Sequence, residues 1–118
     1  MLLKALLTIV TAGTIATGLF HTELKSSSPA KDSTGPSPAK VTLTFTENVN
    51  VAVSSITILK SDTTEVAKLV VAATPDSATI EGAVVTPLKA GKYLIRYRTA
   101  SADGHAVRGT FGFTVTKK

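Results

Sequence analysis

The stretch Val41-Thr42-Leu43-Thr44-Phe45-Thr46 alternates strictly between large apolar and threonine side chains. Successive side chains of a β-strand point to opposite faces, so this period of two predicts a strand that is buried on one face only. Residues 93–98 and 110–115 repeat the pattern with aromatic residues on the apolar face. No period typical of a helix follows residue 20, so the sequence predicts an all-β domain.

On either side of this stretch, turn-forming residues divide the chain into short extended segments. Residues 26–38 are rich in serine, proline and lysine and predict an irregular loop after a short first strand. About seven strands separated by turns favour an antiparallel sandwich or a Greek-key barrel. The predicted strands are residues 23–25, 41–46, 51–59, 65–71, 78–85, 93–98 and 110–115.

The apolar positions of these strands predict one small hydrophobic core. The predicted core residues are Leu24, Val41, Leu43, Phe45, Ile56, Ile58, Leu69, Val71, Ile80, Tyr93, Ile95, Tyr97, Phe111, Phe113 and Val115.

The first twenty residues differ from the rest of the chain. Lys4 precedes an uncharged apolar run, which is the pattern of an export signal. We therefore expect a signal peptide at residues 1–20 and a mature domain at residues 21–118. Cleavage before Leu19 is the alternative, because the small residue Gly18 suits the position before a cut better than Phe20 does.

Composition narrows the chemistry. The net charge is +5, but the basic residues are dispersed, so no nucleic-acid footprint is predicted. Without cysteine the chain forms neither disulfides nor thiolate metal sites.

The two histidines offer a route to a metal site. If the mature chain begins at His21, its α-amine and its imidazole can chelate one ion, and an α-amine has a pKa of about 7.7–8.0. Asp103 and His105 are separated by one residue, so both side chains point to the same side if the segment is extended. The resulting set of three nitrogens and one oxygen suits Cu(II) best, with zinc as a competitor.

Simpler interpretations exist for the same residues. An Asp-x-His sequence commonly forms a polar turn in which the aspartate accepts backbone amides. His21 is also consistent with an ordinary terminal residue that binds nothing.

Several stretches together resemble the CopC family of periplasmic copper-binding proteins. The resemblance rests on His21-Thr22-Glu23-Leu24-Lys25-Ser26-Ser27-Ser28-Pro29-Ala30, residues 41–47, residues 86–93, Ser101-Ala102-Asp103-Gly104-His105 and residues 109–115. It implies a seven-stranded Greek-key β-barrel or sandwich with immunoglobulin-like, cupredoxin-like topology. It also implies one Cu(II) per chain, held by the amine and imidazole of His21, by His105 and by Asp103. Glu47 matches an acidic residue that lies near copper in some members; its simpler interpretation is an exposed carboxylate at a strand end.

The resemblance implies a periplasmic carrier or buffer in copper homeostasis or resistance, not an enzyme. No methionine or histidine lies between residues 51 and 83, so a methionine-rich Cu(I) site is not expected. We expect a monomer, with a separate inner-membrane copper transporter of the CopD type as its protein partner. Two alternatives remain open: an oxidative enzyme with a copper histidine brace, and a structural immunoglobulin-like module without metal.

Overall fold

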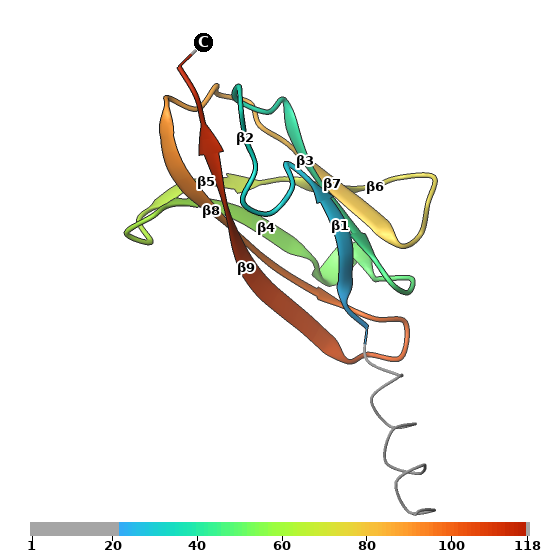
Figure 1. Ribbon diagram of the computed structural model, residues 1–118. Helices are drawn as coiled ribbons and strands as arrows, with labels where there is room; N and C mark the ends of the chain where they lie inside the picture. The colour runs from blue at the N-terminus through green and yellow to red at the C-terminus, as the bar shows by residue number, and fades with distance from the viewer. Residues whose placement is uncertain (1–21, 118) are drawn as a thin grey trace, which may run out of the picture.

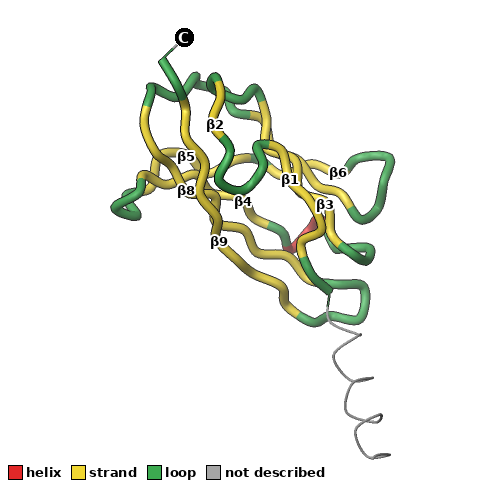
Figure 2. The backbone as a smooth tube through the Cα atoms, viewed as in Figure 1, coloured by secondary structure: helices red, strands yellow, loops and turns green. Residues whose placement is uncertain are grey.

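The computed structural model describes residues 22–117, which form two β-sheets packed face to face (Figure 1). One sheet has the strand order β1-β3-β7-β6, and the other has the order β2-β9-β8-β4-β5. The strands are β1 (Leu24–Ser28), β2 (Thr34–Gly35), β3 (Lys40–Phe45), β4 (Ser55–Lys60), β5 (Glu65–Leu69), β6 (Val71–Ala73), β7 (Thr79–Ala83), β8 (Gly91–Ala100) and β9 (Ala106–Val115). Figure 2 shows that strands and their connecting loops make up nearly all of the described chain.

The predicted all-β sandwich is therefore confirmed. Its short helical turn, η1 (Val51–Val53), precedes β4. Within the described part of the chain, no helix has the length and apolar character needed to cross a bilayer. The predicted signal peptide and His21 lie outside the described residues.

The core lies between the two sheets and follows the alternation that the sequence shows. In β3, Val41, Leu43 and Phe45 are buried, whereas the threonines between them are partly exposed. Thirteen predicted core residues are buried, and the other two, Leu24 and Val71, pack against them while partly exposed. Leu59 is also buried, at 1% exposure. The alternation of β4 did not predict it, because four consecutive residues of that strand are buried.

Three predicted segments were wrong in detail. Residues 51–53 form the helical turn instead of the start of a strand, because the side chain of Asn50 accepts a hydrogen bond from the Ala52 N–H and caps it. The predicted strand 65–71 is two strands in different sheets, β5 and β6, and the chain crosses between the sheets at Val70. The predicted loop 26–38 contains β2, which pairs in parallel with the end of β9.

Gly82 in β7 makes room for Leu69 just before this crossing. A Cβ atom added at Gly82 would lie 2.8 Å from Leu69 Cβ, which is closer than real Cβ atoms approach. We expect Gly82→Ala to lower the free energy of unfolding by about 1–3 kcal/mol, because overpacking forces the neighbouring strand to shift. Urea denaturation measures the change. Gly112→Ala is the matched control, since its added Cβ would meet neighbours only at 3.5 Å and beyond; equal losses in both variants would contradict the explanation.

Candidate metal centre

The segment Ser101–His105 is a tight turn that joins the ends of the long β8–β9 hairpin. The Ser101 N–H donates to the His105 carbonyl (3.0 Å), and the Gly104 N–H donates to the Ser101 carbonyl (2.9 Å). Gly104 has a φ of 90°, in the region that favours glycine. The segment is therefore not extended, as the metal-site argument assumed, but forms the polar turn of the simpler interpretation.

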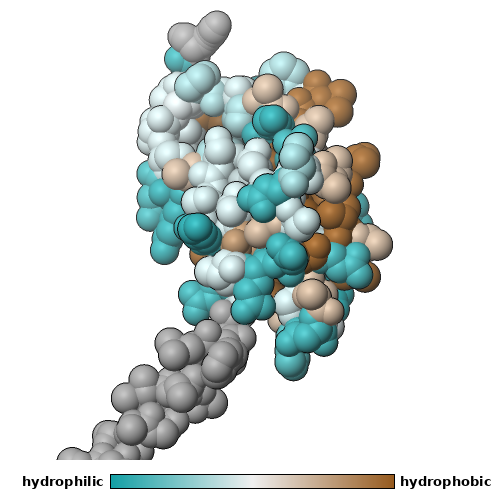
Figure 3. Space-filling view, turned by 90° about the vertical axis from the view of Figure 1, so that its right-hand side faces the viewer, coloured by the Kyte–Doolittle hydropathy of each residue, from teal (hydrophilic) through white to brown (hydrophobic). Residues whose placement is uncertain are grey.

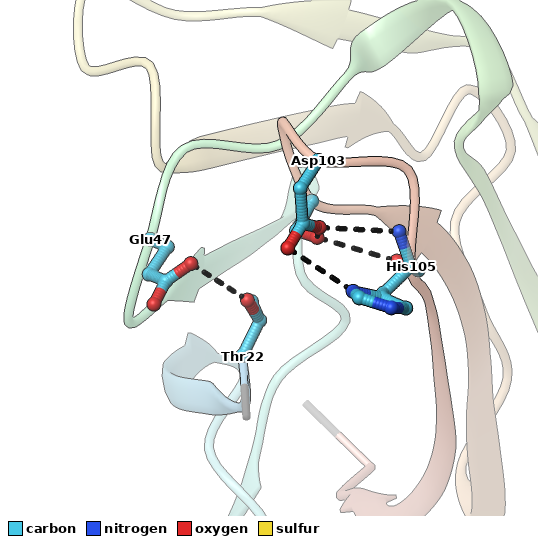
Figure 4. Close-up of polar contacts among 5 residues, drawn as sticks. Thr22, Glu47, Asp103 and His105 are labelled. Carbon is cyan, nitrogen blue, oxygen red and sulfur yellow. Dashed lines mark hydrogen bonds and ion pairs between the residues drawn. The ribbon is translucent and has the colours of Figure 1, made fainter. Parts of the chain in front are cut away.

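The turn nevertheless brings Asp103 and His105 together (Figure 4). His105 Nδ1 lies 3.1 Å from Asp103 Oδ2. The other carboxylate oxygen, Oδ1, accepts hydrogen bonds from the Ser101 hydroxyl and from the His105 N–H (3.3 Å). The two side chains are 65% and 85% exposed, respectively, so an ion in solution can reach both.

These contacts determine the charge of the turn. The Ser101 hydroxyl, followed by the His105 N–H, lowers the pKa of Asp103 below its ordinary value of 3.8. Because the pKa of Asp103 is lower in the folded protein than in the unfolded chain, its contacts stabilise the folded state at pH values above the unfolded-chain pKa. This contribution is lost as the pH falls through the pKa of the folded state. The carboxylate is thus ionised near neutral pH, and it can bind a cation without losing a proton.

Glu47 lies in the loop after β3 and faces the start of the described chain. Its Oε1 accepts a hydrogen bond from the Thr22 hydroxyl (3.0 Å) (Figure 4). Two hydrogen bonds hold the adjacent strand ends together: the Glu23 N–H donates to the Thr46 side-chain Oγ1 (3.0 Å), and the Thr46 N–H donates to the Glu23 carbonyl (2.9 Å). The entry of the chain into β1 is therefore fixed against the end of β3.

The same loop is paired with the turn that carries Asp103. Val49 forms an antiparallel bridge with Ser101, and the Asn50 N–H donates to the Ala100 carbonyl (2.9 Å). Figure 1 shows the start of β1 and the β8–β9 turn at the same end of the sandwich. Thr22, Glu47, Asp103 and His105 are thereby collected at one end of the domain.

Among residues 22–117, no group of three or more histidine and carboxylate side chains is close enough to hold a metal ion. The structure brings together Asp103 and His105, and it directs Glu47 to Thr22 instead of to that pair. His21, the fourth predicted site residue, precedes the described part. Ser101, which was not predicted as a site residue, orients Asp103. A serine two residues before an aspartate is a weak sequence signal for a turn closed by side-chain hydrogen bonds.

Comparison with known proteins identifies the family. The CopC domain matches residues 24–116. The chain is 34% identical to copper resistance protein C of Escherichia coli over an aligned length of 120 residues, and the alignment covers 95% of each protein. It is 31% identical to copper resistance protein C of Pseudomonas syringae pv. tomato over 116 residues, 92% of each protein.

Two solved structures have the same fold. The crystal structure of CopC from Methylosinus trichosporium OB3b superposes with a TM-score of 0.76 at 32% identity, covering 82% of this chain and 95% of that one. PcoC, a methionine-rich copper resistance protein from Escherichia coli, gives a TM-score of 0.71 at 35% identity, covering 81% and 99%. The match along the sequence and the shared two-sheet fold lead to one conclusion: this chain belongs to the CopC family.

Proposed function

We propose that this protein binds one Cu(II) ion per chain and carries or buffers copper in the periplasm, in copper homeostasis or resistance, without catalysing a reaction. The ligands are the amine and imidazole of His21, the imidazole of His105 and the carboxylate of Asp103. Glu47 is an acidic neighbour that stabilises the positive charge of the ion. The names of the relatives, which are copper resistance proteins, support the metal.

The observation that carries the proposal is that Thr22, Glu47, Asp103 and His105 lie at one end of the sandwich. Asp103 and His105 present an oxygen and a nitrogen from one exposed turn. Thr22, which directly follows His21 in the sequence, donates a hydrogen bond to Glu47, and Glu47 lies in the loop that pairs with this turn. His21 itself lies outside the described residues, and its place in the ligand set is part of the proposal.

The donor set favours Cu(II) over Cu(I). Nitrogen and carboxylate ligands suit Cu(II), whereas Cu(I) prefers thiolate and thioether sulfur. PcoC is described as methionine-rich, but this chain has a single methionine, Met1, and no cysteine. The protein therefore handles the oxidised ion, and exchange between a Cu(I) site and a Cu(II) site is not part of its function.

Titration with Cu(II) at two pH values tests this proposal. We expect one equivalent to bind tightly at pH 7.5 and the affinity to fall steeply below about pH 6, because imidazole and amine ligands must lose protons before they bind a metal. Asp103 does not cause this loss, since its lowered pKa keeps it ionised throughout the range. Isothermal titration against a competing chelator gives stoichiometry and affinity. Affinity that does not change between pH 7.5 and 5 would contradict nitrogen ligation.

The exposed surface supports a carrier over an oxidative enzyme that acts on polysaccharides. The chain has no tryptophan, and both tyrosines, Tyr93 and Tyr97, are buried at 7–8% exposure. Among residues 22–117 no aromatic side chain is exposed, so this part of the chain has no flat aromatic face of the kind on which such enzymes place a sugar chain. A separate inner-membrane transporter of the CopD type is the proposed recipient or donor of the copper, and the protein acts as a monomer.

A further inference from the structure

A second surface feature lies away from the candidate copper site. A groove of about 670 Å³ separates β5 from the loop that joins β7 to β8, residues 84–90. Leu69 and Tyr93, both almost fully buried, form part of its lining, and Val84 and Leu88 line its loop side. Its size lies within the range of about 300–1,000 Å³ that is usual for ligand sites.

The loop side of this groove is held in place by hydrogen bonds. The Tyr93 hydroxyl donates to the Lys89 carbonyl (2.7 Å), and the Leu88 N–H donates to the Ser37 hydroxyl oxygen (2.8 Å). At the start of the loop, the Val84 N–H donates to the Ala39 carbonyl (2.9 Å). The groove is therefore preformed, and a ligand that enters it does not have to order the loop.

Apolar side chains are exposed around the groove. Val66, Val70 and Val85 are 38%, 85% and 88% exposed, and all three line it. In the described residues, only one other large apolar side chain, Val53, is comparably exposed. Figure 3 shows apolar residues gathered along one margin of the molecule. Clustered exposed apolar side chains usually mark an interaction site.

The groove also borders an open sheet edge. β5 is the last strand of its sheet and pairs only with β4, whereas β6, which follows it, is the last strand of the other sheet. An edge strand exposes backbone N–H and C=O groups that can pair with an added strand. An extended peptide can therefore bind β5 through its main chain while its alternate side chains fill the groove.

The charges around the groove select the occupant. Lys60, Lys68 and Lys89 line it from three different elements, and no aspartate or glutamate is among its lining residues. We propose that this groove docks an extended segment of a partner protein in which acidic and apolar residues alternate, and that the segment adds to β5 as a further strand.

This charge pattern disfavours two other occupants. A second copy of the chain would bring lysines against lysines, and like charges across an interface oppose association. A fatty acid has one carboxylate, which cannot satisfy three separated ammonium groups. An acidic segment places a carboxylate near each of them.

Docking here leaves the candidate copper site free. Tyr93 lies near the start of β8 and Ser101 just past its end. At about 3.3 Å per residue, these positions are roughly 26 Å apart. A partner bound at the groove can therefore hold the protein at one end while the turn with Asp103 and His105 remains accessible. Peptide docking at the groove does not require a bound metal.

Nuclear magnetic resonance of the full mature domain tests the proposal. The probe is a capped peptide of alternating glutamate and valine, titrated into the ¹⁵N-labelled protein. We expect amide shifts confined to β5 and residues 84–90, and weaker binding as salt rises. Lys68→Glu should weaken binding at least about fivefold, because it places a negative charge against the acidic peptide. Lys68 is exposed, so the variant is expected to fold.

Lys31→Glu is the matched control. It makes the same charge change at an exposed position before β2, at the opposite edge of the same sheet. This variant should keep the affinity of the unmodified protein within about twofold, since a screened charge beyond about 10 Å has little effect. Equal losses in both variants, or equal binding of a peptide with lysine in place of glutamate, would overturn the proposal. So would shifts on β5 caused by protein concentration alone, or by dodecanoate but not by the acidic peptide.

Discussion

Replacing His105 with alanine is expected to lower the affinity for Cu(II) by more than about 100-fold, because loss of a mere supporting contact to a ligand already costs about 10- to 100-fold. His105 is the only histidine among residues 22–117. After its loss, the described part of the site keeps only the carboxylate of Asp103, and the proposed ligand set falls from three nitrogens to the two of His21. Competition titration at pH 7.5 measures the change.

The stability of this variant should hardly change. The His105 side chain is 85% exposed, and substitutions at such surface positions usually alter the free energy of unfolding by no more than about 0.5 kcal/mol. Arg108→Ala is the control, because Arg108 is also exposed and lies in the same hairpin. It should leave copper binding unchanged. Tight binding by the His105→Ala protein would contradict the proposed ligand set.

Phe45→Ala is expected to lower the free energy of unfolding by about 3–5 kcal/mol, the usual cost of emptying a buried aromatic site. Phe45 is 1% exposed, and its ring packs edge-to-face on Tyr97 with centroids 5.7 Å apart. Because marginal domains have only about 5–15 kcal/mol of stability, this loss is a large fraction of the total. Urea denaturation monitored by circular dichroism measures it.

The effect should extend to the end of the domain that carries the site. Phe45 is the last residue of β3, where it pairs with Leu24 of β1, and Glu47 follows two residues later. Phe45→Leu, which retains part of the buried volume, should cost less than Phe45→Ala. A loss below 1 kcal/mol for the alanine variant would show that this ring does not support the core.

The sequence predicted the fold well wherever one face of a strand is buried. Strict alternation in β3 and β8 identified the core residues because only one side of each strand faces the other sheet. It failed at Val70, where the chain leaves one sheet and enters the other without a glycine or proline to signal the change. It also failed for β2, whose two residues gain their pairing from the distant β9.

The proximity of two candidate site residues was predictable, but the geometry that brings them together was not. Spacing predicted that the Asp103 and His105 side chains lie on the same side, and in the structure His105 Nδ1 lies 3.1 Å from Asp103 Oδ2. The contact comes from a turn closed by Gly104 and Ser101 instead of from an extended strand, because local hydrogen bonds outweigh the period of two there. The hydrogen bond between the Thr22 and Glu47 side chains joins residues that are 25 positions apart in the sequence. No local sequence pattern predicts such a contact.

The most direct test of the copper site is to move the α-amine away from the His21 imidazole. Cu(II) affinity is measured for the chain that begins at His21, verified by intact mass, and for the same chain with a short glycine-serine extension in front of it. We expect one tightly bound Cu(II) for the first chain and an affinity lower by more than about 100-fold for the second, because the chelate ring loses one ligand. Equal affinity in the two chains would contradict this expectation.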